Sequence, residues 1–95
     1  MTVVMPRILI LGRDTCEDTI RSRAHLDARG IPYDYRNVEQ DAEADARNRS
    51  FNSGVRVTPT ILVGDPESPA RVLSEPSDDE LDAAIAESPA SPYPA

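Results

Sequence analysis

The stretch Arg7-Ile8-Leu9-Ile10-Leu11-Gly12-Arg13-Asp14-Thr15-Cys16 decides the fold that we expect for this chain. Its apolar run is too short for a buried helix. The β-branched residues in the run and the glycine that ends it predict a strand buried on both faces, as in a parallel sheet. Thr15 offers a helix N-cap, and the residues that follow it, Cys16-Glu17-Asp18, complete the spacing of a capping box. We therefore expect a buried strand that leads directly into a helix, with Cys16 at the start of that helix.

Six further elements are expected along the chain. The helix that begins at Cys16 contains no Gly or Pro as far as Arg29, and Gly30 occupies the position where a positive φ is wanted. The other elements are a strand over 33–38, a helix over 39–52, a strand over 60–63 that a turn over 64–69 joins to a return strand over 71–73, and a helix that starts at the capping box 77–80 and runs through Ile85. The order β-α-β-α-β-β-α starts with a right-handed parallel crossover and closes with an antiparallel hairpin. This order predicts an α/β domain with a central four-stranded mixed sheet, the thioredoxin fold.

Composition limits the function classes. The chain has 95 residues, enough for one domain, which we place over 1–87, with a disordered Pro/Ser/Ala tail over 88–95. The formal charge of -7 argues against nucleic acid or an anionic membrane as a partner, since both need a basic surface. No apolar run approaches the roughly 20 residues that cross a bilayer, and no secretory signal is recognisable. We therefore expect a cytoplasmic monomer.

The chain contains one cysteine and one histidine. One cysteine cannot form an internal disulfide, and one histidine cannot support a zinc site alone, so no bound metal is expected. Any redox chemistry must therefore pair Cys16 with a thiol outside this chain.

The position of Cys16 favours a reactive thiolate, although its neighbours oppose one. A thiol at a helix N-terminus faces unpaired backbone N–H groups and the positive end of the helix dipole, and Arg13 adds a cation nearby. Negative charge surrounds the same thiol at Asp14, Glu17 and Asp18. Because the opposing effects are similar in size, the direction of the pKa shift stays open. A small buried structural cysteine is the alternative interpretation.

A second feature follows the second expected helix. In Val57-Thr58-Pro59, the proline comes directly before an apolar strand, where it cannot donate a ladder hydrogen bond and so belongs at the first position of the strand. The loop 12–16 is similar to the loop that carries the active-site C-P-Y-C of glutaredoxins. Residues 57–59 resemble the Thr-Val-Pro that precedes the third strand of that family, whose proline is cis. The resemblance to glutaredoxins extends from Ile8 to Ile85.

The mycoredoxins of actinobacteria are the glutaredoxin subtype that the chain resembles most. Its landmarks are matched by three stretches, at 30–34, 50–54 and 73–81. Two family features are absent: the Gly-Gly before the last helix is replaced by Ser74-Glu75, and the second active-site cysteine is replaced by Thr19, which gives Cys16-Glu17-Asp18-Thr19. This motif also differs from the C-G-F-S of the monothiol glutaredoxins that bind iron–sulfur clusters, so no bridged cluster is expected.

The resemblance implies a role for each residue of the site. Cys16 would be the nucleophile, and Arg13 would hold a carboxylate of a low-molecular-weight thiol. Thr58, before cis-Pro59, would pair its backbone with the peptide-like bond of that thiol. The other end of the thiol would meet two residues at the N-terminus of the last helix, Ser77 and Asp78.

Together these observations predict a thiol–disulfide oxidoreductase that works by a monothiol mechanism on mixed disulfides between proteins and a small thiol. Glutathione, mycothiol or bacillithiol would be the co-substrate, with no bound cofactor. The alternative is a thioredoxin-fold binding module with weak or no catalysis, which the acids beside Cys16 and the missing second cysteine favour. Supplying electrons to ribonucleotide reductase is disfavoured because that role uses a dithiol. Two structural predictions follow: Thr58-Pro59 is cis and close to Cys16, and Cys16 is at least partly exposed.

Overall fold

The computed structural model describes residues 5–89, and its elements follow the expected order. They are β1 (Ile8–Gly12), α1 (Glu17–Ala28), β2 (Asp34–Asn37), α2 (Ala42–Ser50), β3 (Thr60–Asp65), β4 (Ser68–Ser74) and α3 (Asp78–Glu87). The sheet has the strand order β2-β1-β3-β4. β1 is parallel to β2 and antiparallel to β3, and β3 is antiparallel to β4. The predicted four-stranded mixed sheet is therefore confirmed.

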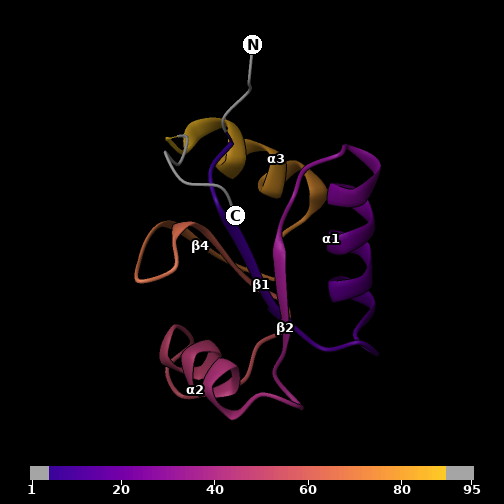
Figure 1. The fold of residues 1–95 in the computed structure, drawn as a ribbon. Helices are drawn as coiled ribbons and strands as arrows, with labels where there is room; N and C mark the ends of the chain where they lie inside the picture. Colours follow the sequence, from indigo (N-terminus) through magenta and orange to yellow (C-terminus); the bar gives the residue numbers. More distant parts are fainter. Residues whose placement is uncertain (1–4, 90–95) are drawn as a thin grey trace.

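Helices cover the two faces of this sheet (Figure 1). Alternate residues of β1 point to opposite faces, as the two-residue period of a strand requires. Ile8 and Ile10 join the core beneath α1 and α3, whereas Leu9 and Leu11 join the core beneath α2. Every residue of β1 is buried, which confirms the prediction of a strand buried on both faces. β1 therefore anchors the start of α1 in the centre of the domain.

The predicted N-cap of α1 is wrong by one residue. The N–H of Cys16 donates to the carbonyl of Arg13 at 3.2 Å, which closes a turn before the helix begins. The first helical hydrogen bond runs from Ile20 N–H to Cys16 C=O at 2.9 Å. Cys16 is therefore the N-cap instead of Thr15, and its side chain makes no capping hydrogen bond. The other end of α1 agrees with the prediction, because Gly30 follows it with a φ of +66°.

α2 is shorter at both ends than the predicted helix over 39–52. The side chain of Asn37 accepts from Glu39 N–H at 2.9 Å, which forms a turn where the helix was expected to start. Asp41 then caps the helix by accepting from Ala44 N–H. The strand predicted over 60–63 continues to Asp65, and the return strand begins earlier than expected, so the hairpin is longer than predicted.

The capping box predicted at the start of α3 is confirmed, with Ser77 as its N-cap. The tail predicted over 88–95 falls mostly outside the described residues. Within residues 5–89, no helix is both long enough and apolar enough to cross a membrane.

Candidate active site

Cys16 lies where the buried strand β1 gives way to α1. Its side chain is partly exposed, and its Sγ lies 3.4 Å from the carbonyl oxygen of Thr58, which comes from the loop before β3. The Thr58-Pro59 peptide bond is cis. Both structural predictions are therefore confirmed: the cysteine is accessible, and the cis proline lies beside it.

An asparagine on α2 holds the loop that carries Thr58. The amide of Asn48 is fully buried, and it pairs with both backbone groups of Val57, accepting from its N–H at 2.9 Å and donating to its C=O at 2.7 Å. The same amide lies 3.4 Å from the carbonyl of Leu11 at the end of β1. Asn48 thus ties the loop to the strand that leads to Cys16. Sequence reasoning missed this residue, because its partners lie on other elements and no local pattern marks it.

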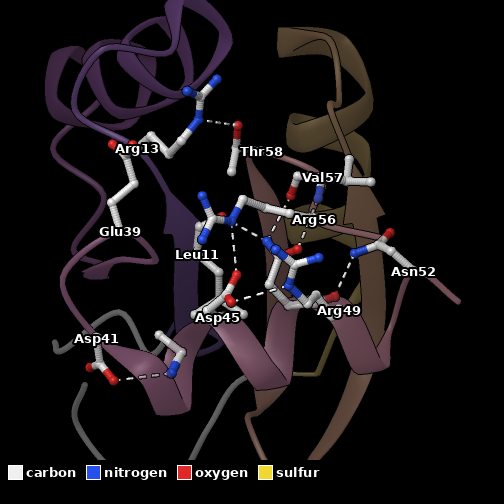
Figure 2. Close-up of polar contacts among 12 residues, drawn as sticks. Leu11, Arg13, Glu39, Asp41, Asp45, Arg49, Asn52, Arg56, Val57 and Thr58 are labelled. Carbon is white, nitrogen blue, oxygen red and sulfur yellow. Dashed lines mark hydrogen bonds and ion pairs between the residues drawn. The ribbon is translucent and has the colours of Figure 1, made fainter. Parts of the chain in front are cut away.

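Two arginines lie beside Thr58, one reaching it from another loop and one in its own loop (Figure 2). Arg13 reaches over from the β1–α1 loop, and its Nε donates to the hydroxyl of Thr58 at 3.3 Å. Arg56 points away toward α2, where it pairs with Asp45 at 2.8 Å beside Arg49. The structure therefore brings together four predicted site residues from distant parts of the chain: Arg13, Cys16, Thr58 and Pro59.

Two of the three acids near Cys16 are paired with arginines. Asp14 accepts from the Tyr35 hydroxyl at 2.7 Å and lies 4.0 Å from Arg23, whose guanidinium stacks over the Tyr35 ring at 3.8 Å. Burial and the bond to Asp14 raise the pKa of Tyr35 to about 12, so this phenol remains a hydrogen-bond donor at neutral pH.

Asp18 is the second paired acid, and it accepts from Arg21 at 2.8 Å. These pairings reduce the negative field that the sequence places around Cys16.

Contributions of opposite sign act on the pKa of the Cys16 thiol, and their net effect is to lower it. Partial burial raises the pKa, but hydrogen bonds from the side chains of Thr58 and Thr19 outweigh it, together with backbone groups of Thr19 and Asp18 at the start of α1. The neutral thiol can donate to the Thr58 carbonyl, which favours the protonated form, whereas the thiolate can only accept. The sequence left the direction of this shift open, and in the folded protein the contacts of Cys16 lower the pKa of its thiol.

Thr19 occupies the position of the family's second cysteine and is completely buried. Its hydroxyl accepts from Arg13 N–H at 3.4 Å. A Cβ built on Gly12 would lie 2.6 Å from Thr19, so only glycine allows the end of β1 to approach the first turn of α1 this closely. Thr19 therefore packs against the end of β1, at the strand–helix corner where Cys16 lies. Its spacing from Cys16, one helical turn, is the signal that could have identified it as a neighbour of the sulfur.

Ser77 and Asp78 lie apart from this group, in an open groove between α1 and the start of α3. The groove has a volume of about 550 Å³ and is lined by Asp18, Arg21, Glu75, Ser77, Asp78 and Glu80. The Ser77 hydroxyl already accepts from Glu80 N–H at 3.1 Å, and Arg21 is engaged by Asp18 and the carbonyl of Pro76. Although this is the helix N-terminus expected to meet an anion, its lining is mainly acidic.

A second cleft, of about 510 Å³, lies on the α2 side of the sheet, against Leu9, Leu11 and Ala44. None of the predicted site residues lines it. Among residues 5–89 no group of three or more His, Cys, Asp or Glu side chains is arranged to hold a metal ion. The candidate chemistry therefore centres on Cys16.

Comparisons with known proteins agree with this geometry. A family model described as Glutaredoxin matches residues 8–66, more than half of the chain. The solution structure of glutaredoxin from Brucella melitensis is similar in fold, with a TM-score of 0.60 and 22% sequence identity over 92% of this chain and 86% of that one. A search among curated proteins found no match. The extent of the family match, together with a cysteine at the strand–helix corner beside a cis proline, shows that this chain belongs to the glutaredoxin family.

Proposed function

We propose that this glutaredoxin-like thiol oxidoreductase acts by a monothiol mechanism, removing small thiols from proteins that carry them as mixed disulfides. The observation that carries the proposal is the environment of Cys16: an accessible sulfur whose pKa is lowered, at an uncapped helix start beside Thr58-Pro59. The thiolate is the nucleophile in disulfide exchange, so a lowered pKa makes more of the reactive form available near neutral pH.

The reaction consists of two exchanges. In the first, the Cys16 thiolate attacks the small-thiol sulfur of the mixed disulfide, which forms a disulfide on Cys16 and releases the protein substrate as a thiolate. In the second, another molecule of the small thiol, as its thiolate, attacks the small-thiol sulfur held on Cys16. This step regenerates the Cys16 thiolate and releases the small thiol as its symmetrical disulfide. One small thiol from solution is consumed for each mixed disulfide reduced, because the other half of the symmetrical disulfide is the small thiol removed from the protein, and no cofactor takes part.

The monothiol assignment follows from the contents of the chain. Cys16 is its only cysteine, and the hydroxyl of Thr19 stands one helical turn away, where a resolving thiol would be needed. A protein disulfide attacked by Cys16 would leave the enzyme joined to its substrate with no internal thiol to release it. A small-thiol disulfide on Cys16 can be removed by a thiol from solution.

We place the small thiol across the loop of Thr58 and the groove beside α3. The backbone of Thr58, held before cis-Pro59, would receive its peptide-like part. The bond from Arg13 to Thr58 uses Nε, so the terminal nitrogens of this guanidinium are available to hold a carboxylate. The far end of the thiol would reach Ser77 and Asp78 at the start of α3. Glutathione, mycothiol and bacillithiol are the candidates, and mycothiol is the one expected if the mycoredoxin-like subtype is correct.

The test compares two substrates. Wild type and Cys16→Ser are assayed for removal of glutathione or mycothiol from a modified peptide, and for reduction of insulin. We expect wild type to act on the mixed disulfide and poorly on insulin, and Cys16→Ser to act on neither. Activity that survives Cys16→Ser would refute the mechanism. Trapping the mixed disulfide on Cys16 from a cell extract and measuring its mass would identify the small thiol.

A binding module without catalysis is the second candidate, favoured by the acidic lining of the groove next to α1. Alkylation with iodoacetamide at neutral pH separates the two functions. A Cys16 that reacts faster than the same cysteine in the urea-unfolded chain supports the oxidoreductase. A Cys16 that is unreactive when folded supports the binding module. For either function we propose a location in the cytoplasm.

A further inference from the structure

The loop before β3 is tethered on both sides of Thr58. Before it, Val57 forms two hydrogen bonds with the side chain of Asn48: its N–H donates to Oδ1 at 2.9 Å and its C=O accepts from Nδ2 at 2.7 Å. After it, the C=O of Pro59 accepts from Glu75 N–H at 2.9 Å. The carbonyl oxygen of Thr58 itself lies 3.4 Å from the sulfur of the candidate nucleophile. The hydrogen bonds of its two neighbours therefore fix the Thr58 backbone beside that sulfur.

The Asn48 side chain supplies the bonds that a neighbouring strand would give to a strand residue. The antiparallel pairing of β1 with β3 extends to Leu11 and Thr60, and Val57 lies beyond it. The Asn48 amide bridges this gap, because its Nδ2 also lies 3.4 Å from the C=O of Leu11. Removing the amide takes away the acceptor of Val57 N–H and one of two donors to its C=O, the other being the Thr60 hydroxyl at 2.8 Å. Asn48 is completely buried, so water does not readily replace these bonds.

We propose that Asn48 is a positioning residue, which holds the backbone of Val57 and Thr58 where it can pair with the peptide-like part of the small thiol. Its side-chain hydrogen bonds go to Val57 and Leu11, so it acts on the substrate through the loop. The inference rests on the proposed function, in which the Thr58 backbone receives the small thiol. It assigns the preference for amide-bearing thiols to a buried residue of α2. Because a misplacement of about 1 Å can slow a reaction greatly, loss of this hold should appear in the rate of exchange.

The rival explanation is that Asn48 only stabilises the domain, as a buried amide whose hydrogen bonds are satisfied. A purely stabilising residue affects the exchange of every mixed disulfide alike, or of none. A positioning residue affects only the substrates that pair with the backbone of the loop. The two explanations therefore differ in substrate selectivity, which a loss of stability alone does not change.

The experiment measures the first exchange in a single turnover, with excess enzyme, on two mixed disulfides of one peptide. The first carries glutathione or mycothiol, whichever wild type uses faster, and both of these thiols contain an amide bond. The second carries β-mercaptoethanol, which contains none. We expect wild type to prefer the first. Asn48→Leu keeps the volume of the side chain and removes its amide, so we expect it to slow exchange of the first about tenfold and to leave the second nearly unchanged.

Asn52→Leu is the matched control, since it makes the same change four residues further along the chain. The Asn52 amide donates to Asn48 C=O at 2.7 Å and to the Thr60 hydroxyl at 3.0 Å, and it accepts from the Ser74 hydroxyl at 2.9 Å. None of these bonds reaches the backbone of residues 57–59. We therefore expect this variant to keep the wild-type ratio of the two rate constants, even where urea denaturation shows that it is less stable.

Three results would overturn the inference: Asn48→Leu slowing both disulfides equally, Asn48→Leu slowing neither, or Asn52→Leu producing the same selective loss. Circular dichroism verifies that each variant folds, and Asn48→Ala, with the same expected result, replaces an Asn48→Leu protein that does not. Wild type that exchanges both disulfides at the same rate also overturns the inference but leaves the proposed function standing. Wild type that exchanges neither disulfide contradicts the proposed function itself.

Discussion

The N-terminal ends of α1 and α3 differ in what their unpaired backbone N–H groups contact. At the start of α3, Ser77 Oγ accepts from Glu80 N–H and the Glu80 carboxylate accepts from Ser77 N–H, both at 3.1 Å, so the helix satisfies its own donors. At the start of α1 the N-cap is Cys16, and its side chain makes no capping hydrogen bond. The backbone groups of Asp18 and Thr19 act on the sulfur of Cys16 instead.

The comparison shows what an uncapped helix contributes to chemistry. A side-chain cap stabilises a helix by about 1 kcal/mol, and α1 forgoes that contribution. Because no side chain caps α1, the first N–H groups of this helix and the positive end of its dipole can act on the Cys16 thiolate. The helix start with the weaker local structure is the one that can stabilise a nucleophile.

The largest expected effect comes from giving α1 a cap of the kind that α3 has. Cys16→Ser places a hydroxyl at the N-cap, so we expect complete loss of exchange activity together with a gain of up to about 1 kcal/mol in the free energy of unfolding. Deglutathionylation assays and urea denaturation measure the two effects. Cys16→Ala, which cannot cap, is the control and should be inactive without the gain. A Cys16→Ser protein less stable than Cys16→Ala would contradict the comparison.

The next effect concerns the residue one turn into α1. Thr19→Cys places a second thiol about 5 Å from Cys16 between Cα atoms, within the range that a disulfide can span. We expect insulin reduction to rise several-fold, because the new thiol releases a bound protein substrate. Thr19→Ser, which adds no thiol, is the control. Wild type reducing insulin as fast as Thr19→Cys would refute the monothiol assignment.

A third change tests the tight corner before α1. Gly12→Ala introduces a Cβ 2.6 Å from Thr19, and we expect a loss of about 1–3 kcal/mol of stability from overpacking. Urea denaturation measures the loss. Combining Gly12→Ala with Thr19→Ala should recover part of it, because the smaller side chain makes room. Additive losses in the double variant would show that the two residues do not constrain each other.

Removing the cap of α3 should have a smaller effect. Ser77→Ala leaves Glu80 N–H without its acceptor, and we expect a loss of about 1 kcal/mol in the free energy of unfolding. Ser77→Asp restores an N-cap acceptor and should recover most of the loss. If Ser77→Ala were as stable as wild type, the capping box would not distinguish the two helix starts.

The smallest effect is on the pH dependence of stability. The pKa of Cys16 is lowered in the folded protein, so the thiolate is favoured by folding. Its contribution is present above the pKa of the unfolded chain and lost as the pH falls through the folded value. Urea denaturation across this window should show a slightly larger gain with rising pH for wild type than for Cys16→Ala. Equal pH dependences would contradict the lowered pKa.

Local sequence signals were sufficient for the elements of this domain. The apolar run before Gly12, the glycine after α1 and the capping box at Ser77 each act within a few residues, and all three were interpreted correctly. The boundary at Cys16 was missed because a turn closed by the Arg13 carbonyl delays the helix by one residue. A Thr-Pro pair has no local preference that specifies a cis bond. That prediction came from the position of the proline, which opens the strand after the second helix, together with the family resemblance, and the structure confirmed it.

The sequence by itself determined the order of the elements and the identity of the single thiol, and its motifs located Cys16 at a strand–helix corner. Only the tertiary structure decided what surrounds the sulfur. The acids counted against the thiolate lie next to it in the chain, but Asp14 and Asp18 pair with arginines further along. The groups that lower the pKa of Cys16 include the side chain of Thr58, which is 42 residues away in sequence. Short-range patterns report backbone preference, whereas a pKa depends on every charge and hydrogen bond in space, and those are set only when the chain packs.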